Sequence, residues 1–234
     1  MFGFKRVEKR PFNRMMETTG AYDGGATGVM TGIVAGTRVA TSMGWREAGA
    51  LQKGDLVLTF DGGLQTVTGV TRSPLWSGAG HCPAHFWPLL VPAGAIDNAK
   101  PMLVLPRQGV MLESDLAENV LGDPFALIPA AALDGVRGIE RIYPNDPIEV
   151  ISLRFATDQV IFAEQGTLLF CPAGGDLLKL ALQGSREFCP YRMLPETCAL
   201  ELVRDSDGRG ECSSCLEAFR AQNSRAFTGH TKAA

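Results

Sequence analysis

The sequence predicts an all-β domain followed by a small helical appendage, and three observations lead to this fold class. β-Branched residues alternate with other types over residues 37–41, a spacing that favours a strand. The dipeptide Asp61-Gly62 ends an apolar run and suits a hairpin turn. Short apolar runs separated by Gly and Pro continue to residue 172, which is typical of an all-β domain.

Composition excludes several classes of function. The chain has 234 residues, of which 45% are hydrophobic and 20% charged, so it can bury a sizeable core. A net charge of -3 gives no reason to expect nucleic acid as a partner. No apolar run approaches the roughly 20 residues of a membrane helix, so we expect no membrane partner. The basic amino terminus has no apolar segment behind it, which predicts a cytoplasmic protein without a secretory signal.

Three regions follow from the order of these patterns. Residues 1–27 are polar, Gly-rich near their end and without periodicity, and they predict a flexible leader. Residues 28–172 form the predicted β domain, whose clearest strand is the alternating run 151–155. Further strands are expected at 32–41, 56–60, 65–70, 102–112 with a bend at Pro106, 125–129, 159–163 and 166–170. Asp115 to Leu121 has the composition of a helix, although a turn is the alternative.

The last region, residues 173–234, predicts a helical tail that contains four cysteines. The run Asp176 to Leu182 indicates a helix that Asp176 caps. Two more helices are expected at 195–204 and 211–222, joined by a polar stretch that contains Gly. Residues 223–234 read as a frayed end.

Five blocks of the sequence carry a resemblance to a known family. They are Ala35–Thr41, Gly44–Arg46, Gly54–Thr59, Leu103–Pro106 and Val160–Ala163. Together they resemble a bacterial Hint domain, the fold shared by hedgehog autoprocessing domains and inteins. The similarity covers about residues 29–172, and its opening blocks are the more specific. It implies a compact, pseudo-two-fold β-disk with two intertwined halves.

The resemblance implies self-cleavage, and four positions carry that chemistry. A Cys or Ser at the start of the first strand attacks the preceding carbonyl, and this position holds Gly32. A Thr-x-x-His element donates a proton to the departing amide, and here Leu105 and Gln108 replace its Thr and His. A further His of many bacterial relatives is replaced by Gln159. Glutamine can donate a hydrogen bond, but it cannot exchange a proton near neutral pH.

Two hypotheses about function follow. The favoured one is a catalytically degenerate Hint domain, not an enzyme, which serves as a binding or structural module for an unknown protein partner. The alternative is an autoprocessing protein that cleaves its own backbone near residue 32 by an N-to-S or N-to-O acyl shift. Thr31 carries the nearest hydroxyl, one step out of register.

We expect the cysteines to be thiols or metal ligands and not a disulfide framework, because the chain has no export signal. Cys212 and Cys215 form a Cys-x-x-Cys, which can supply two of the four ligands of a structural zinc. Cys189 and Cys198 would complete the set, although their spacing is wider than usual. A redox pair and reduced cysteines are the alternatives, and no other cofactor is predicted. His81, Cys82 and His85 could also suggest a metal, but we interpret them as loop residues that pack against Trp76 and Trp87.

Overall fold

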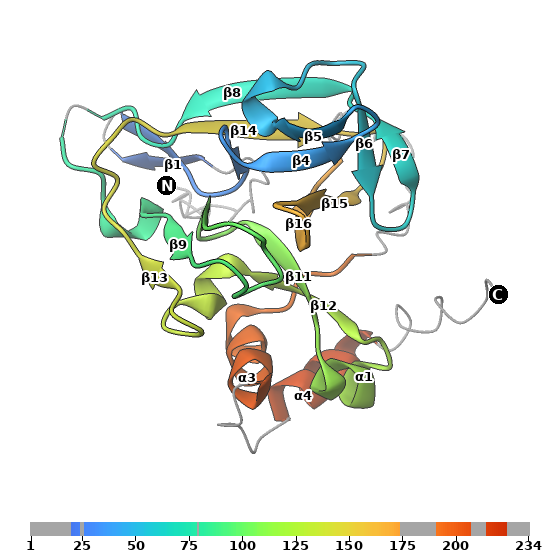
Figure 1. Ribbon diagram of the computed structural model, residues 1–234. Helices are drawn as coiled ribbons and strands as arrows, with labels where there is room; N and C mark the ends of the chain where they lie inside the picture. Colours follow the sequence, from blue (N-terminus) through green and yellow to red (C-terminus); the bar gives the residue numbers. More distant parts are fainter. Residues whose placement is uncertain (1–19, 24–25, 79, 174–190, 207–213, 224–234) are drawn as a thin grey trace, which may run out of the picture.

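The structure is a computed structural model that describes residues 20–23, 26–78, 80–173, 191–206 and 214–223. Two antiparallel sheets dominate the described part, with helices grouped at one end of the molecule (Figure 1). The six-stranded sheet has the order β13 (Glu140–Arg141), β9 (Leu89–Val91), β10 (Met102–Val104), β3 (Ile33–Val34), β14 (Glu149–Arg154), β8 (Gly69–Pro74). This confirms the mainly β fold class that the sequence predicts.

The second sheet has eight strands. Its order is β12 (Phe125–Pro129), β11 (Gly109–Glu113), β16 (Thr167–Cys171), β15 (Gln159–Ala163), β4 (Arg38–Thr41), β6 (Leu56–Thr59), β7 (Gly63–Thr66), and β5 (Gly44–Glu47) pairs with β4. A separate hairpin joins β1 (Gly20–Asp23) to β2 (Ala26–Val29). Short turns of helix are η1 (Ala48–Ala50), η2 (Ala84–Phe86) and η3 (Ala130–Leu133).

Strands β3 and β4, near the start of the β region, lie inside the two sheets. Ile33 of β3 pairs with Val104 of β10 on one side and with Ile151 of β14 on the other. Val39 of β4 pairs with Ala163 of β15 in the second sheet. Strands from the two ends of the β region are therefore intertwined, and the first strands are held by strands that come much later in the sequence.

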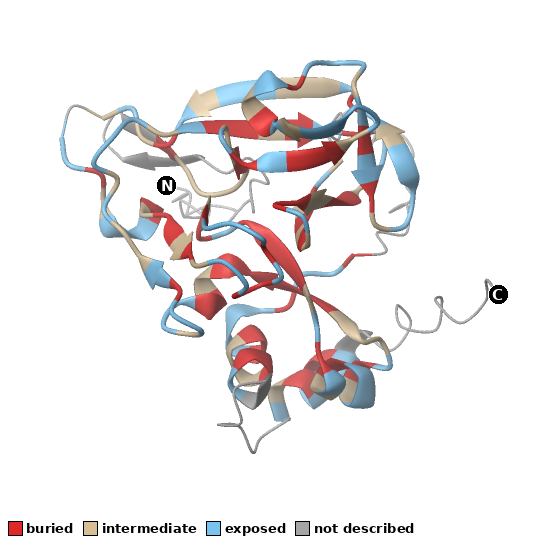
Figure 2. Ribbon diagram, in the orientation of Figure 1, coloured by how far each residue is buried: buried red, intermediate tan, exposed pale blue. Residues whose placement is uncertain are grey.

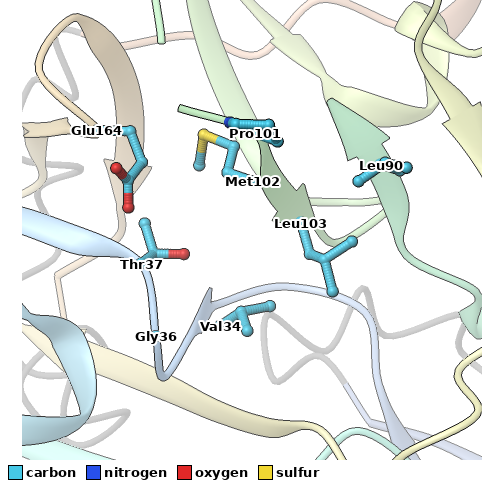
Figure 3. A pocket seen from close by; sticks show the side chains of 8 residues that line it. All are labelled: Val34, Gly36, Thr37, Leu90, Pro101, Met102, Leu103 and Glu164. Carbon is cyan, nitrogen blue, oxygen red and sulfur yellow. The ribbon is translucent and has the colours of Figure 1, made fainter. Parts of the chain in front are cut away.

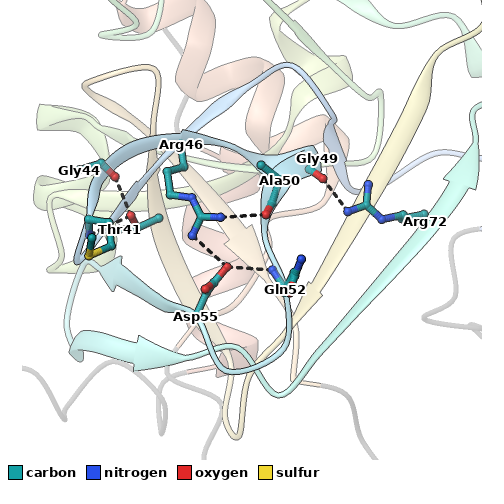
Figure 4. Close-up of polar contacts among 9 residues, drawn as sticks. Thr41, Gly44, Arg46, Gly49, Ala50, Gln52, Asp55 and Arg72 are labelled. Carbon is teal, nitrogen blue, oxygen red and sulfur yellow. Dashed lines mark hydrogen bonds and ion pairs between the residues drawn. The ribbon is translucent and has the colours of Figure 1, made fainter.

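Polar residues of the opening motifs stabilise the turns between the first strands (Figure 4). The Arg46 guanidinium lies 3.1 Å from a carboxylate oxygen of Asp55 and donates to the carbonyl of Ala50. The same Asp55 oxygen accepts from the backbone N–H of Gln52 at 2.9 Å. These contacts give the blocks Gly44–Arg46 and Gly54–Thr59 a structural role, because they tie β5 to the loop that precedes β6.

The predicted flexible leader needs a correction at its end. Residues 1–19 lie outside the described residues, but Gly20 pairs with Val29 in the β1–β2 hairpin. The Gly-rich, polar sequence of this hairpin has no alternation of apolar residues, so periodicity could not indicate it.

Three helices pack together at the end of the molecule opposite β8 (Figure 1). They are α1 (Asp115–Leu121), α3 (Glu196–Ser206) and α4 (Ser214–Asn223). The Ser114 side chain caps α1, whose helical composition the sequence had left open. The predicted helices at 195–204 and 211–222 are confirmed as α3 and α4, whereas the predicted helix 176–182 lies outside the described residues. Of the helices described, none has the length and apolar character needed to cross a membrane.

The helices share the main hydrophobic core of the β region. α3 packs against η3 and β12, and α4 packs against α1. Leu202 and Leu216 are fully buried in the same cluster as Ile128, Leu133 and Leu169. Figure 2 shows buried segments both in the strands and in α3 and α4. The tail that the sequence predicts as an appendage is therefore a structural part of the core.

Candidate functional site

The residues at the expected nucleophile and proton-donor positions lie in direct contact. The backbone N–H of Gly32 donates to Oε1 of Gln108 at 2.8 Å. Gln108 is only 3% exposed, and its Nε2 donates to the carbonyls of Phe170 at 2.7 Å and Gly109 at 3.1 Å. Because Nε2 already faces two acceptors, the amide can point only its oxygen at Gly32. The structure thus brings together two positions that are 76 residues apart in the sequence.

Gly32 has a backbone conformation that disfavours any side chain. Its φ is +118°, a region that L-residues with a Cβ rarely adopt. A Cβ built on Gly32 would lie 2.6 Å from Cγ1 of Val150 and 3.2 Å from the carbonyl oxygen of Ile151. The local structure is therefore built around the missing side chain, and a Cys or Ser would require β14 to shift.

One hydroxyl group near Gly32 was not predicted from the sequence. Oγ of Ser152 on β14 lies 3.4 Å from the position a Cβ of Gly32 would occupy. Alternation in the strand 149–154 could have placed Ser152 and Val150 on one face, but no sequence signal relates that face to Gly32. The proximity follows from the pairing of β14 with β3.

Leu105 and Gln159 lie in different parts of the structure. Leu105 is fully buried in a small apolar cluster with Leu75 and Val150, beside Gly32. Gln159 is 7% exposed, and its Nε2 donates to Oγ1 of Thr157 at 2.8 Å. Gln159 pairs with Cys171 across β15 and β16, and its side chain lies near Gly62 in the β6–β7 turn. Leu105 therefore belongs to the surroundings of Gly32, whereas the contacts of Gln159 lie with another turn.

The chain that leads to Gly32 is tied to the β domain. The N–H of Val29 donates to the carbonyl of Leu75, and the N–H of Arg107 donates to the carbonyl of Met30, both at 2.9 Å. The peptide bond between Thr31 and Gly32 therefore lies between hydrogen-bonded residues on both sides. Thr31 is half-buried.

A small pocket is lined by residues of β3, β9 and β10 (Figure 3). It has a volume of about 190 Å³, below the roughly 300 Å³ of common small-molecule sites. Its lining is mostly apolar, and its one carboxylate, Glu164, accepts from the backbone N–H of Arg38 at 2.7 Å. The lining residues are Val34, Gly36, Thr37, Leu90, Pro101, Met102, Leu103 and Glu164. The carboxylate thus joins β4 to the β15–β16 turn, and the pocket offers no reactive group.

Two of the tail cysteines form a disulfide. Cys198 of α3 and Cys215 of α4 are bonded, with Cα atoms 5.2 Å apart. The expectation that the cysteines stay outside disulfides is therefore wrong for this pair, because the packing of α3 on α4 brings the two sulfurs together. Cys189 and Cys212 lie outside the described residues, so the four-cysteine zinc site stays a prediction. Within the ranges that the structure describes, no three His, Cys, Asp or Glu side chains are grouped to hold a metal.

The remaining described cysteines are free thiols in apolar surroundings. Burial raises the pKa of Cys171 to about 12, and burial also raises the pKa of Cys82. Neither thiol is therefore ionised near neutral pH, as a nucleophile or a metal ligand would require. In the loop that holds Cys82, Nε1 of Trp87 donates to the carbonyl of Cys82, and the His85 ring contacts Phe86. Cys82 therefore contacts Trp87, as the sequence interpretation expects, whereas His85 contacts Phe86 and His81 contacts Tyr143.

The two sheets are intertwined, and Gly32 lies just before the central strand β3. This architecture agrees with the family that the sequence matches. The model of the Hint domain matches residues 31–168, which is more than half of the chain. The chain belongs to the Hint domain family.

Solved structures give a likeness at low sequence identity. A bacterial intein-like domain from Clostridium thermocellum is 12% identical, with a TM-score of 0.43, over 60% of this chain and 99% of that chain. The gp41-1 intein is 16% identical, with a TM-score of 0.37, over 60% and 98%. The MchDnaB-1 intein is 13% identical, with a TM-score of 0.38, over 58% and 98%. Curated proteins yield no match to the chain.

Proposed function

We propose that this chain is a Hint domain protein that has lost self-cleavage and serves as a binding or structural module. The observation that carries the proposal is the hydrogen bond from the Gly32 N–H to Oε1 of Gln108. Cleavage of the Thr31–Gly32 peptide needs a proton delivered to that nitrogen, and an amide oxygen can only accept one. The contact therefore has the opposite polarity to the one that the reaction requires.

The surroundings support the same conclusion. Gly32 has no side chain to attack the Thr31 carbonyl, and its positive φ and the contact with Val150 leave no room for one. Leu105 places an apolar side chain where the family has a Thr. Oxyanion stabilisation without a nucleophile and an acid would not cleave a peptide bond at a useful rate. With the chemistry lost, what the chain keeps is a stable β domain, which suits it to binding a protein partner or to a structural role.

Intact-mass spectrometry of the freshly expressed full chain tests this proposal. We expect one full-length species that persists for days, with or without added thiol or hydroxylamine. The variants Thr31→Ala and Ser152→Ala remove the two hydroxyls near the peptide bond, and we expect their mass spectra to differ only by the substitution. A fragment cut next to Gly32 that either variant abolishes would overturn the proposal and establish autoprocessing.

A further inference from the structure

The small pocket lined by β3, β9 and β10 also contains two polar side chains that are almost fully buried. Glu164 is 6% exposed and Thr37 is 4% exposed, and both line the pocket. Figure 3 shows the Glu164 carboxylate directed toward Thr37, whose hydroxyl points into the pocket. Polar groups in an apolar pocket determine which ligand it prefers, because the ligand must replace the hydrogen bonds that they make with water.

Both side chains keep hydrogen-bonding capacity that the described residues do not use. Oε1 of Glu164 accepts from the backbone N–H of Arg38, whereas Oε2 has no partner in the described part of the chain. Thr37 makes its hydrogen bonds there through its backbone N–H and carbonyl, with Val34 and Ala48. Since no described side-chain oxygen is both buried and unpaired, Oε2 and the Thr37 hydroxyl face the open space of the pocket.

The charge of the Glu164 carboxylate is not balanced by a cation within the described ranges. The ion pairs found there use other carboxylates, those of Asp55, Glu149 and Asp134. A buried carboxylate is costly unless opposite charge and hydrogen bonds offset it. Its position is also fixed, because Glu164 lies in a tight turn in which Glu164 and Gln165 both have positive φ. A fixed carboxylate of this kind favours a cationic ligand.

The walls of the pocket favour a short aliphatic chain. Leu103 of β10 pairs with Leu90 of β9, so the two side chains lie on one face of the six-stranded sheet, and Met102 lines the pocket beside them. The pocket opens to solvent where Gly36 and Pro101 are exposed. Its volume of about 190 Å³ is below that of common small-molecule sites, so only a short chain fits.

Other ligand classes fit this pocket less well. An anion would be repelled by Glu164, and an uncharged apolar ligand would leave two buried oxygens without partners. A metal ion needs more donors, and no three His, Cys, Asp or Glu side chains are grouped among the residues described.

The shape of the cation can also be inferred. A guanidinium pairs best with both oxygens of a carboxylate, but the Arg38 N–H already occupies one oxygen of Glu164. An ammonium carries three donors on a single nitrogen, which suits one carboxylate oxygen and one hydroxyl.

We propose that this pocket binds a primary alkylammonium group, of a small free amine or of a lysine side chain on a partner. The ammonium donates to Oε2 of Glu164 and to the Thr37 hydroxyl, and its alkyl chain lies against the apolar walls. The inference is independent of the loss of cleavage, because neither Gly32 nor Gln108 lines the pocket.

Titration of the full chain with butylammonium chloride, followed by amide NMR shifts at neutral pH and constant ionic strength, tests this site. We expect saturable shifts at Thr37 and Met102. Glu164→Gln keeps an acceptor for the Arg38 N–H and removes the charge, so it should weaken binding at least about tenfold. Thr37→Val removes one neutral hydrogen bond and should weaken binding about fivefold.

Controls separate this site from non-specific binding. Glu113→Gln, which changes an exposed carboxylate on β11, should leave the affinity unchanged. Butanol and butylguanidinium should each bind at least about tenfold more weakly than butylammonium, because one lacks the charge and the other the geometry. Leu103→Trp fills the pocket without altering either polar group, and it should abolish the shifts.

The two sources of the ammonium group are distinguished with acetyl-lysine methylamide, which adds a peptide group on each side of a lysine. Binding at least as tight as that of butylammonium would support a lysine of a protein partner, and weaker binding would support a small free amine. The absence of saturable shifts with both probes would contradict an ammonium site. Affinity that is unchanged in Glu164→Gln, or equal for butanol, would also contradict it.

Discussion

Gln108 joins three backbone segments through one side chain. It accepts from Gly32 and donates to Phe170 and Gly109, so β3, β11 and β16 meet at a single buried amide. A fully satisfied buried amide specifies one arrangement, because any rotation leaves several polar groups without partners. Gln108, which the sequence predicts at the family's proton-donor position, therefore has a structural role in this chain.

The substitution Gln108→Met keeps the size of this side chain and removes all three hydrogen bonds. Each buried group left without a partner costs about 1–3 kcal/mol, so we expect a loss of about 3 kcal/mol or more in the free energy of unfolding. Urea denaturation measures this loss. Gln65→Met is the control, since the Gln65 amide donates one exposed hydrogen bond to Gly62 and should change stability by about 0.5 kcal/mol. Equal effects of the two substitutions would contradict the structural role.

Gly32 gives a second prediction at the residue scale. Gly32→Ala should lower the free energy of unfolding by about 3 kcal/mol, because the positive φ costs about 1–3 kcal/mol and the contact with Val150 adds to it. Gly36→Ala is the matched control, since an added Cβ there meets open space. In the double variant Gly32→Ala/Val150→Ala, only the part of this loss that comes from the contact between the added Cβ and Val150 should be recovered. A Gly32→Ala protein as stable as Gly36→Ala would show that the backbone adapts freely.

The buried thiol of Cys171 makes a prediction about pH. Its pKa is about 12 in the folded chain and about 8.5 in an unfolded one, so the folded state favours the protonated thiol. This contribution is complete below about pH 8.5 and is lost as the pH rises toward 12. The melting temperature should therefore fall more steeply between pH 8 and 11 in the unmodified chain than in Cys171→Ala. Parallel curves would contradict the burial of an ionisable thiol.

At the scale of elements, the strands with the clearest apolar patterns were predicted, and the features without a local sequence pattern were not. β6, β14 and β15 lie where alternation or short apolar runs indicate them, and Pro106 interrupts β10 and β11 as expected. Gly20–Val29 has no such pattern, so its hairpin was missed. The Cys198–Cys215 disulfide was missed for a similar reason, since helix packing and not cysteine spacing brings the pair together.

The candidate site, too, could be predicted only in part. Gly32, Leu105 and Gln108 were identified by their places in the family pattern, and the structure brings them together. The hydrogen-bond polarity between Gly32 and Gln108 could not be predicted, because it depends on the two carbonyls that orient the amide. Ser152 and the positive φ of Gly32 depend on β14, a strand more than 100 residues away in the sequence.

The disulfide between α3 and α4 makes a prediction for these two helices. It closes a loop with a sequence separation of 17, for which the chain-entropy model gives about 3 kcal/mol of stabilisation. The double variant Cys198→Ala/Cys215→Ala should lose about this much stability in urea, and added reductant should have the same effect on the unmodified chain. Cys82→Ala is the control, and its stability should respond to reductant as the unmodified chain does.

Peptide mapping without reduction identifies the bond itself. Trypsin should release the peptide 193–204 linked to 210–220, with Cys215 and not Cys212 as the partner of Cys198. Reduced protein that retains one zinc per chain, and that maps with all four tail cysteines protected, would instead support the metal site predicted from the sequence. The two outcomes are exclusive for Cys198 and Cys215, because a disulfide sulfur is not a thiolate ligand.

At the scale of the whole molecule, the β region and the helices share one hydrophobic core. Leu194, Leu202 and Leu216 are buried in the core that also holds Ile128 and Leu133. Burying a large apolar side chain is worth about 1.5–3 kcal/mol, whereas a whole domain is stable by only about 5–15 kcal/mol. We therefore expect the β region to depend on the helices for its stability.

Truncation tests this dependence. A chain ending at Ala173 should be insoluble or lack a cooperative thermal transition, because it exposes the surface that α3 and α4 cover. A chain ending at Asn223, the last residue of α4, retains all of the helices described and should melt as the full chain does. Circular dichroism and calorimetry measure both. A cooperatively folded, soluble product from the first truncation would show that the β region is an independent domain.

The shared core also determines when folding can be completed during synthesis. Strands β3 and β4 lie inside the two sheets, yet their partners β14 and β15 are made more than 100 residues later, and Phe219 of α4 belongs to the same core. Contacts this distant in sequence slow folding, and unpaired strands wait for their partners as the chain grows. Folding should therefore be slow, and the emerging β region stays incomplete until β14, β15 and α4 have been made.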